Sequence, residues 1–412
     1  MVQNFDLGII GGGPAGYTAA LHAAAKGLRV VMFEKDCVGG VCLNRGCIPT
    51  KAILHSAELF EEMKCAQELG INCESLYVDY KSVIEHKNKV VERLRKALEL
   101  SLKNSGVTSV KAEACLISST EIEADGEIFK CKNIIAACGS SPRSLKGMEF
   151  DGEFILNSDD ILNRDRLPES IVIVGSGAIG TEWARIFAAF GVQVTIVEMA
   201  ENLLPAADIE VSKRVERIFK TKKIKAYKST SVEKIQDKKV YLTTGEILEP
   251  ECVLIAAGRV PNSCKKLEGV AYLGDMYGSV QLAHFAIKQA VSYVDGISFE
   301  ETLVPSVVYG SPEIAWVGKR EQDLEEGTYQ KSLLLISALG KSHCDNSTDG
   351  FIKILSQYDR IVGAHIVSKE ASAMIQQVLI AIQNNISVSR LKEICFAHPT
   401  YSEGIFESLF KL

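Results

Sequence analysis

The sequence lacks several features that would indicate other classes of protein. Its 46 basic residues are outnumbered by 52 acidic ones, which gives a net charge of −6. A chain with this balance has no basic surface of the kind that binds nucleic acid or an anionic membrane. No apolar run approaches the roughly 20 residues of a membrane span. We therefore expect neither nucleic acid nor membrane among its partners.

Two further absences concern targeting and metals. Met1 leads almost directly into the strand-like residues 5–10, with no charged leader and no cleavage site, so we expect a cytoplasmic protein. Most of the 12 cysteines are isolated and are expected to be reduced thiols that act as small hydrophobic residues. No second pair of cysteines or histidines follows at ligand spacing, so we expect no metal site.

One stretch, residues 39–51, stands out from this background because Cys42 and Cys47 lie five positions apart. An ideal helix would separate their Cα atoms by about 8.6 Å, and a disulfide needs about 4.4–6.8 Å. The two can bridge only across a distorted turn, which Gly46 and the glycines at 39 and 40 permit. A disulfide held in this way is easily reduced, which favours a redox catalyst over a structural link. A buried pair that does not bridge is the alternative.

The N-terminal residues have the pattern of a dinucleotide-binding unit. A strand at 5–10 is followed by Gly11, Gly13 and Gly16, a helix at 17–26, a strand at 29–33 and Glu34. In such units the glycines let the backbone approach a pyrophosphate at the helix N-terminus, and the acid binds ribose hydroxyls. The alternative is a glycine-rich turn that binds nothing.

This pattern occurs a second time. A strand at 171–174, Gly175, Gly177 and Gly180, a helix from Thr181 to about 190 and a strand at 192–197 lead to Glu198. The last glycine and the acid are 18 residues apart in both copies. The run 254–261 also echoes the run that ends at Pro142. We therefore predict two nucleotide-binding domains, and Glu198 favours NAD over NADP because a carboxylate repels a 2′-phosphate.

The chain changes character from about residue 304. Strands are predicted at 307–309, 332–336, 351–355 and 361–366, followed by helices at 371–384 and 388–394. These strands read as an antiparallel sheet. The predicted fold class is α/β, with two Rossmann-like nucleotide-binding domains and a C-terminal α+β dimerisation domain.

Taken in order, these motifs resemble the flavin-dependent pyridine nucleotide–disulfide oxidoreductases of class I. The residues that carry the resemblance are Gly11–Gly16 with Glu34, Cys42–Lys51, Gly175–Glu182, Ala257–Asn262, Gly274 with Asp275, and His398–Thr400 with Glu403. Within this family, the run Cys-Leu-Asn-x-Gly-Cys-Ile-Pro-x-Lys is most similar to the dihydrolipoamide dehydrogenases. The resemblance covers nearly the whole chain.

The resemblance implies a division into domains and an assembly. Residues 1–145 and 272–302 would form an FAD-binding domain, 146–271 an NAD-binding domain abbreviated at its end, and 303–412 an interface domain. It implies a homodimer in which each active site takes its His398–Glu403 pair from the partner subunit. The implied reaction is oxidation of dihydrolipoamide, on a lipoyl-bearing protein or as a small dithiol, with NAD⁺ through FAD and an active-site disulfide.

The resemblance also implies roles for individual residues. Cys42 would exchange with the substrate, Cys47 would face the flavin, His398 would act as base, and Glu403 would orient and stabilise its imidazole. Lys51 would lie near flavin N5 and pair with Glu182. The implied cofactor-binding residues are Gly11, Gly13, Gly16, Glu34, Lys51, Gly139, Asp275 and Ala283 in the FAD domain, with Gly175, Gly177, Gly180, Glu182, Glu198 and Gly258 in the NAD domain.

Simpler structural roles remain open for some of these residues. His398 could be a structural histidine, and Lys51 could be a solvated helix residue. Asp275 could be an acid near a helix N-cap. Glu182, expected two positions inside its helix, could be there to favour the helix dipole.

The chain departs from the family pattern at three places. Eleven residues separate Asn262 from Gly274, where the family usually has a few tens, including the strand that leads into Gly274. Phe396 stands where a histidine is common, and Cys138 replaces the usual threonine. Two alternative functions follow, namely a related disulfide reductase with another thiol substrate, and an FAD-binding member whose NAD side is impaired.

Overall fold

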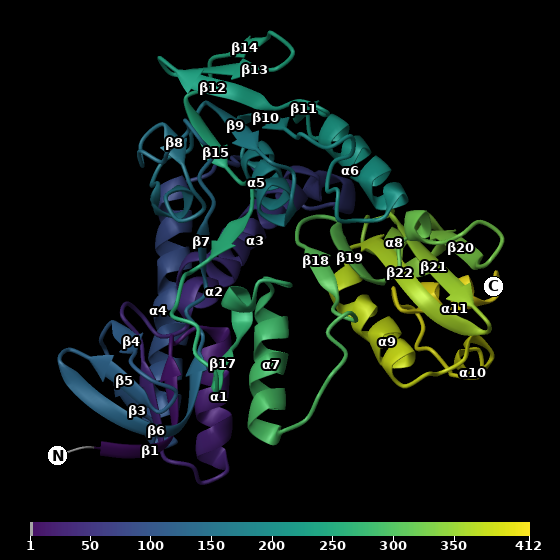
Figure 1. Ribbon diagram of the computed structural model, residues 1–412. Coiled ribbons are helices and arrows are strands. Elements are labelled where there is room, and N and C mark those ends of the chain that lie inside the picture. The colour runs from purple at the N-terminus through teal and green to yellow at the C-terminus, as the bar shows by residue number, and fades with distance from the viewer. Residues whose placement is uncertain (1–2) are drawn as a thin grey trace.

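The computed structural model describes residues 3–412, which form three bodies, each with its own sheet (Figure 1). The first sheet has the order β3-β2-β1-β6-β5-β4, and β17 pairs with β6 off this path. Its strands are β1 (Gln3–Ile10), β2 (Val30–Phe33), β3 (Thr108–Val110), β4 (Ala114–Leu116), β5 (Glu121–Ala124), β6 (Glu127–Ala136) and β17 (Val270–Tyr272). The strands β3, β2, β1, β6 and β17 are parallel to one another, β5 is antiparallel to β6 and β4 is antiparallel to β5, and all four residues of β2 are buried.

Helices cover this first sheet and lead toward the other bodies. Helices α1 and α7 lie side by side against it, and the long helix α4 runs up toward the second body (Figure 1). The elements are α1 (Pro14–Ala25), α2 (Gly40–Arg45), α3 (Cys47–Lys64), η1 (Ala66–Leu69), α4 (Tyr80–Asn104), η3 (Gly274–Tyr277) and α7 (Ala283–Asp295).

The second body contains a parallel sheet of order β11-β10-β9-β15-β8 and a small antiparallel sheet of order β12-β13-β14. Its strands are β8 (Ile155–Leu156), β9 (Ser170–Val174), β10 (Gln193–Val197), β11 (Lys225–Tyr227), β12 (Val232–Gln236), β13 (Lys239–Leu242), β14 (Ile247–Leu248) and β15 (Cys252–Ile255). Its helices are η2 (Ile161–Asn163), α5 (Ala178–Ala189) and α6 (Ile209–Thr221). An antiparallel ribbon of β7 (Ser140–Pro142) and β16 (Arg259–Pro261) connects it to the first body.

The third body is an antiparallel sheet of order β18-β19-β22-β21-β20 with helices packed on it. Its elements are β18 (Ser306–Val308), β19 (Glu313–Gly318), η4 (Glu321–Asp323), β20 (Gln330–Leu335), η5 (Ile336–Ala338), α8 (Gly340–Cys344), β21 (Phe351–Gln357), β22 (Arg360–Ser368), α9 (Ala371–Gln383), α10 (Val388–Leu391) and α11 (Glu403–Leu409). The predicted fold class is confirmed.

The sequence analysis missed β19. This strand contributes Ile314, Ala315 and Val317 to the core and pairs with both β18 and β22. It follows Pro312 closely and is only 6 residues long. Ile314 and Ala315 are adjacent and both buried, so the strand lacks the strict alternation that identifies a half-buried strand.

Helices α1 and α5 both begin three residues before the predicted positions, at Pro14 and Ala178. Gly13 and Gly177 have extended backbones and act as the N-caps, so each helix starts directly after the middle glycine. Glu182 is consequently in the second turn of α5, and the prediction that it lies two positions inside the helix is wrong. The helix dipole acts mainly within the first turn, so it does not account for this carboxylate.

The shortened segment before Gly274 contains a strand, although the resemblance to the family predicted that this strand was lost. β17 is three residues long and pairs in parallel with β6, Val270 with Ile134 and Tyr272 with Ala136. The predicted boundary between the NAD-binding and FAD-binding domains, between residues 271 and 272, falls inside this strand. Because β17 pairs with β6, all of it belongs to the first sheet. Among the helices of residues 3–412, none is long and apolar enough to cross a membrane.

Candidate functional site

The two cysteines lie where helix α2 meets helix α3, directly above the first glycine turn. The backbone of Gly40 has φ of 57°, and a Cβ on this residue would lie 2.6 Å from the Cα of Gly13. The amide of Gly39 donates to the carbonyl of Gly12 at 2.7 Å. Only glycine fits this contact. The cysteine segment is therefore packed on the loop that the sequence predicts to hold the first dinucleotide.

The predicted distorted turn between the cysteines is present. Cys42 lies in α2, Cys47 is the first residue of α3, and Gly46 between the helices has φ −146° and ψ −106°. Both residues are free cysteines, and both are partly buried. The Asn44 amide stabilises the turn by donating to the carbonyls of Val38 and Gly40, each at 3.0 Å. The turn therefore holds the two cysteines at the junction of α2 and α3.

The two thiols differ in acidity. The pKa of Cys47 is lowered to about 7, first because Cys42 donates a hydrogen bond to its sulfur and then because the Lys51 cation is near, while burial opposes this. The pKa of Cys42 is raised, first by that same hydrogen bond, then by burial and by the charge of Cys47. The first proton therefore leaves from Cys47, and Cys42 keeps its proton beside the thiolate.

Lys51 and Glu182 form the predicted ion pair. The Lys51 ammonium lies 2.8 and 2.7 Å from the two carboxylate oxygens of Glu182. The ammonium also lies 4.6 Å from the centre of the Tyr309 ring, whose backbone N–H donates to Glu182 at 3.0 Å. Tyr309 was not predicted as a site residue, and an isolated tyrosine near a strand end gives no sequence signal. This cluster joins all three bodies beside the cysteines.

The first glycine turn has the geometry of a dinucleotide site. A Cβ on Gly16 would lie 1.8 Å from the carbonyl oxygen of Gly11, so helix and strand approach as closely as glycine allows. No side chain caps the N-terminus of α1 at Gly13. Glu34 at the end of β2 accepts from the amide of Gly12 at 2.7 Å and from that of Asp36 at 2.9 Å. Its remaining lone pairs can accept ribose hydroxyls.

The second glycine turn repeats this geometry. A Cβ on Gly180 would lie 1.9 Å from the carbonyl oxygen of Gly175, and a Cβ on Gly177 would meet nothing within 4 Å. Glu198 accepts from the amide and hydroxyl of Ser176, at 2.8 and 2.7 Å, and from the amide of Ala200 at 2.8 Å. Both helices begin without a side-chain cap, and an uncapped helix N-terminus fits the pyrophosphate of a dinucleotide. The hydroxyl of Ser176 was not predicted to act on Glu198.

The ribbon between the first two bodies brings Asp275 and Arg259 together through Ser140. The Ser140 hydroxyl donates to the Asp275 carboxylate, and Arg259 donates to the Ser140 hydroxyl at 2.8 Å and its carbonyl at 2.6 Å. Gly139 and Gly258 directly precede the two ribbon strands, and Ala283 is the first residue of α7. Asp275 lies in the 3-10 helix η3 and does not cap a helix by its side chain. Ser140 is a site residue that the sequence analysis missed.

His398 and Glu403 also meet, at the other end of the chain. The Nδ1 atom of His398 lies 2.7 Å from Glu403 Oε1, and the other carboxylate oxygen accepts from the amide of Thr400 at 2.8 Å. The pKa of Glu403 is lowered, first by that amide and then by His398. The imidazole side chain is 77% exposed. Within one chain, α11 lies far from α2, so the histidine and the cysteines are separated (Figure 1).

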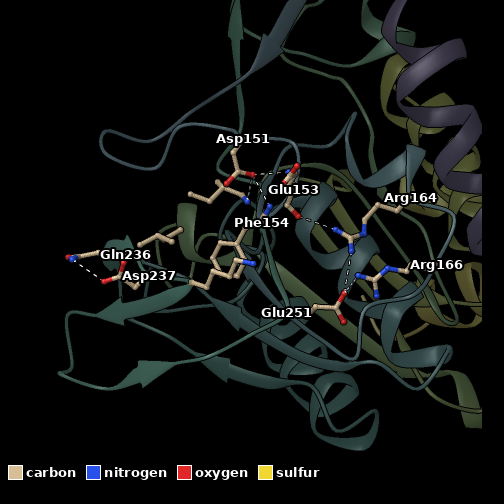
Figure 2. A pocket seen from close by; sticks show the side chains of 11 residues that line it. Asp151, Glu153, Phe154, Arg164, Arg166, Gln236, Asp237 and Glu251 are labelled. Carbon is tan, nitrogen blue, oxygen red and sulfur yellow. Dashed lines mark hydrogen bonds and ion pairs between the residues drawn. The ribbon is translucent and has the colours of Figure 1, made fainter.

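A cavity of about 470 Å³ lies elsewhere, at the edge of the second body beside β8. Figure 2 shows its labelled side chains, among which Arg164 and Arg166 both point toward Glu251. None of the predicted site residues is among the residues that line it. The glycine turns, the cysteines and the Lys51–Glu182 pair together define a nucleotide-dependent dithiol enzyme, and this cavity belongs to none of them.

Comparison with known proteins extends this class to a family. The pyridine nucleotide-disulphide oxidoreductase profile matches residues 5–290, and the profile of the family's dimerisation domain matches residues 304–409. The chain belongs to the pyridine nucleotide-disulphide oxidoreductases. It is therefore an NAD-linked flavoprotein disulfide oxidoreductase that uses FAD and NAD(H), and its dimerisation domain indicates a homodimer.

Several individual proteins are similar along their whole length. A dihydrolipoyl dehydrogenase of Chlamydia pneumoniae is 33% identical over 98% of this chain and 96% of its own. The mitochondrial dihydrolipoyl dehydrogenase 1 of Arabidopsis thaliana is 33% identical over 98% and 89%. The crystal structure of LpdA from Mycobacterium tuberculosis has a TM-score of 0.91 and 25% identity, over 99% of both chains. The HOCl-induced flavoprotein disulfide reductase RclA from Escherichia coli has a TM-score of 0.86 over 98% of this chain and 99% of its own; at 24% identity it shows the fold alone.

Proposed function

We propose that this protein oxidises dihydrolipoamide with NAD⁺ through the Cys42–Cys47 pair. The observation that carries the proposal is the pair of cysteines at the junction of α2 and α3, packed on the first glycine turn, with the Lys51–Glu182 ion pair one helical turn after Cys47. Full-length similarity to dihydrolipoyl dehydrogenases supports the choice of substrate. A lipoyl-bearing protein is the proposed partner, and a free dihydrolipoyl dithiol is the proposed small-molecule equivalent.

The two glycine turns are the proposed cofactor sites. The turn that ends at Gly16, with Glu34, Lys51, Gly139, Asp275 and Ala283, would hold FAD, and the turn that ends at Gly180, with Glu182, Glu198 and Gly258, would hold NAD. When bound, FAD supplies the capacity to carry an electron pair between the dithiol and the nicotinamide. Lys51 would place a cation beside Cys47, held in position by the Glu182 carboxylate.

The acidities of the two sulfurs support an order of events when the pair is a disulfide. A substrate thiolate would attack the sulfur of Cys42 and expel Cys47, which leaves as a thiolate stabilised by the Lys51 ammonium. The second substrate thiolate would then attack the substrate sulfur of the mixed disulfide and release Cys42, which takes up a proton. The products would be the cyclic substrate disulfide and the protein dithiol, so one disulfide is broken for each one formed.

His398 is the proposed base for the substrate thiols. A thiol with a pKa near 8.5 is mostly protonated at neutral pH and needs such a base. Glu403 stays ionised because its pKa is lowered, so it can orient the imidazole and stabilise its cation. Because His398 lies far from Cys42 within one chain, we propose that it acts on the cysteines of the partner subunit (Figure 1).

We propose a domain division that follows from these roles. Residues 1–145 with 272–302, extended to include β17, would form the FAD domain, and the residues between them the NAD domain. Residues 303–412 would form the interface domain. The antiparallel ribbon of β7 and β16 is the connection between the FAD and NAD domains.

The test is a steady-state assay of the purified, FAD-loaded protein with dihydrolipoamide and NAD⁺. We expect NADH to form, and NADP⁺ to be a poorer acceptor because Glu198 repels its 2′-phosphate. Turnover of glutathione disulfide without any turnover of lipoamide would favour the alternative reductase. If the flavin stays oxidised when NADH is added without oxygen, both the dihydrolipoamide dehydrogenase and the alternative reductase would be contradicted. That result would favour an FAD-binding protein whose NAD side is impaired.

A further inference from the structure

The shortened segment after Asn262 lies against the end of β6. The ribbon pairs Pro261 with Ser140, and Asn262 continues this contact. Its amide donates to the carbonyl of Gly139 at 2.9 Å, and its side chain donates to the carbonyl of Cys138 at 2.7 Å. These bonds hold the two crossing chains together immediately before Cys264. The segment is therefore attached to the first body at its first residues.

This attachment brings two further cysteines together. The side chains of Cys138 and Cys264 pack against the same apolar cluster as Met276, and each thiol contributes to the shift in the other's pKa. The amide of Cys138 donates to the sulfur of Met276 at 3.3 Å. Both thiols are free and only partly buried. The pair unites two of the departures noted from the sequence, the replaced threonine at 138 and the shortened segment that carries Cys264.

We propose that Cys138 and Cys264 form a second dithiol–disulfide site, distinct from Cys42 and Cys47. Small-molecule disulfides would oxidise this second pair. The Cys264 thiolate would attack one sulfur of the small disulfide, form a mixed disulfide and release one thiolate. Cys138, after losing its proton, would then attack the sulfur of Cys264 and release the second thiolate. The protein loses two hydrogen atoms and the small disulfide becomes two thiols, so atoms and electrons balance.

The environment of the pair favours a disulfide that forms slowly and lasts. Burial raises the pKa of both thiols, that of Cys138 to about 12. Few thiolates are then present at neutral pH, so exchange is slow. A thiol of high pKa is also a poor leaving group, so the disulfide resists reduction once it has formed. It would close a loop around the whole second body and fasten the ribbon between the two proposed nucleotide-binding domains.

A neighbouring thiol provides the alternative and the control. Cys115 on β4 is exposed, and its charge acts on Cys264. Within residues 3–412, no group of three or more cysteine, histidine, aspartate or glutamate side chains is arranged to hold a metal ion. The choice is therefore between a Cys138–Cys264 link and a Cys115–Cys264 link. The first is favoured because Cys138 and Cys264 pack against the same apolar cluster, whereas Cys115 is exposed.

The test uses the full-length, FAD-loaded protein and oxidised glutathione. After incubation until Cys42 and Cys47 are linked, free thiols are alkylated in denaturant and the protein is digested with trypsin without reductant. Trypsin leaves Cys138 in peptide 133–143 and Cys264 in peptide 260–265. We expect these peptides joined, two hydrogen atoms lighter than their sum, and the loss of both alkylation sites. Cys264→Ser should abolish this product, and Cys115→Ser should leave it unchanged.

Three results would overturn the proposal. The first is full alkylation of Cys138 and Cys264 under conditions that link Cys42 with Cys47. The second is a glutathione adduct that persists on either residue without resolving. The third is a link from Cys264 to Cys115. None of these outcomes depends on the identity of the dithiol substrate, so the test is separate from that of the proposed function.

Discussion

The ammonium of Lys51 lies 2.7 Å from the Glu182 carboxylate and joins helix α3, which begins at Cys47, to helix α5 of the second glycine turn. Lys51 is one helical turn after Cys47, so its charge acts on that sulfur and lowers the pKa of Cys47. The carboxylate is only 5% exposed. The pair therefore links cysteine acidity to the contact between the two nucleotide-binding regions.

Replacing Lys51 should make Cys47 a weaker acid. In Lys51→Met the cation that favours the thiolate is lost, so the pKa of Cys47 should rise. Each unit of that rise lowers the thiolate fraction at pH 7 by up to about tenfold. The measurement is a pH titration of the thiolate absorbance of the reduced protein. The part of the absorbance that is missing in Cys47→Ser is assigned to Cys47. The expected titration lies at higher pH than in the unmodified protein.

Lys64→Met is the matched control, because Lys64 is on the same helix but donates to the carbonyl of Ala189. Its titration should coincide with that of the unmodified protein. Lys51→Arg should restore most of the effect because it restores the charge. A Lys51→Met titration that does not move would show that the cation has no influence on Cys47.

Cys47→Ser should abolish dithiol turnover and leave FAD bound. The cysteine takes part in the disulfide, whereas the proposed FAD contacts come from the glycine turn, Glu34 and Asp275. The measurements are the dihydrolipoamide assay and the flavin absorbance per chain after gel filtration. Cys73→Ser, an exposed cysteine outside the site, should keep both. Loss of flavin from Cys47→Ser would assign the cysteine a structural role.

The sequence was sufficient for the local parts of this site because each has a short-range physical cause. The glycine turns must contain glycine where a Cβ on Gly16 or Gly180 would strike a carbonyl oxygen. The turn between the cysteines is tight at Gly46, where a Cβ would lie 3.1 Å from the carbonyl oxygen of Val41. These requirements are visible as spacings, so the fold class and the positions of the turns could be predicted without coordinates.

Long-range contacts could not be predicted from the same patterns. Ser140 connects Asp275 to Arg259, and Tyr309 lies on the Lys51–Glu182 pair, yet neither residue belongs to a spacing motif. The shortened segment was read as a loss of β17. The structure keeps that strand, because three residues suffice to pair with β6. The starts of α1 and α5 were misplaced because a glycine that caps a helix was read as part of the preceding turn.

His398→Gln should slow dithiol oxidation by about 10²–10⁴-fold, the usual range for loss of a general base. NADH oxidation with a dye as acceptor should be nearly unchanged, because that reaction needs no substrate thiol to be deprotonated. Glu403→Gln should have a smaller effect in the same direction. His343→Gln is the control, since His343 is an exposed histidine whose ring nitrogen contacts the carbonyl of Ser337. Equal losses in both reactions would remove His398 from the role of base.

A mixture of two inactive variants tests which subunit supplies the histidine. Hybrid dimers of Cys47→Ser and His398→Gln contain one intact site only if the histidine acts across the interface. Random exchange of subunits should then restore about one quarter of the unmodified activity, since half of the dimers are hybrids with one intact site each. If His398 acted within its own chain, the mixture would stay inactive.

Replacing Lys353 should reduce the stability of the protein. It is completely buried on β21, and its ammonium lies 2.6 Å from Asp208 and 2.5 Å from Glu321. Asp208 caps helix α6 of the second body, so this cluster joins the second body to the third. In Lys353→Met two carboxylates would lose their buried cation. Removing one partner of a buried ion pair typically costs about 3–5 kcal/mol of the free energy of unfolding.

Lys331→Met is the matched control, because Lys331 pairs with the same Glu321 but its side chain is 45% exposed. It should lower the free energy of unfolding by less than about 1 kcal/mol.

Burial raises the pKa of Glu321, but hydrogen bonds from Lys331, Lys353 and Tyr329 outweigh it and lower the pKa to about 2. The stabilisation from this depressed pKa is present above the ordinary glutamate pKa of 4.5 and is lost as the pH falls toward 2. Urea unfolding at pH 7 and pH 3 should therefore show a smaller difference between Lys353→Met and the unmodified protein at pH 3. If Lys353→Met and Lys331→Met lowered the free energy of unfolding equally, burial of Lys353 would not be the reason that its ion pairs stabilise the protein.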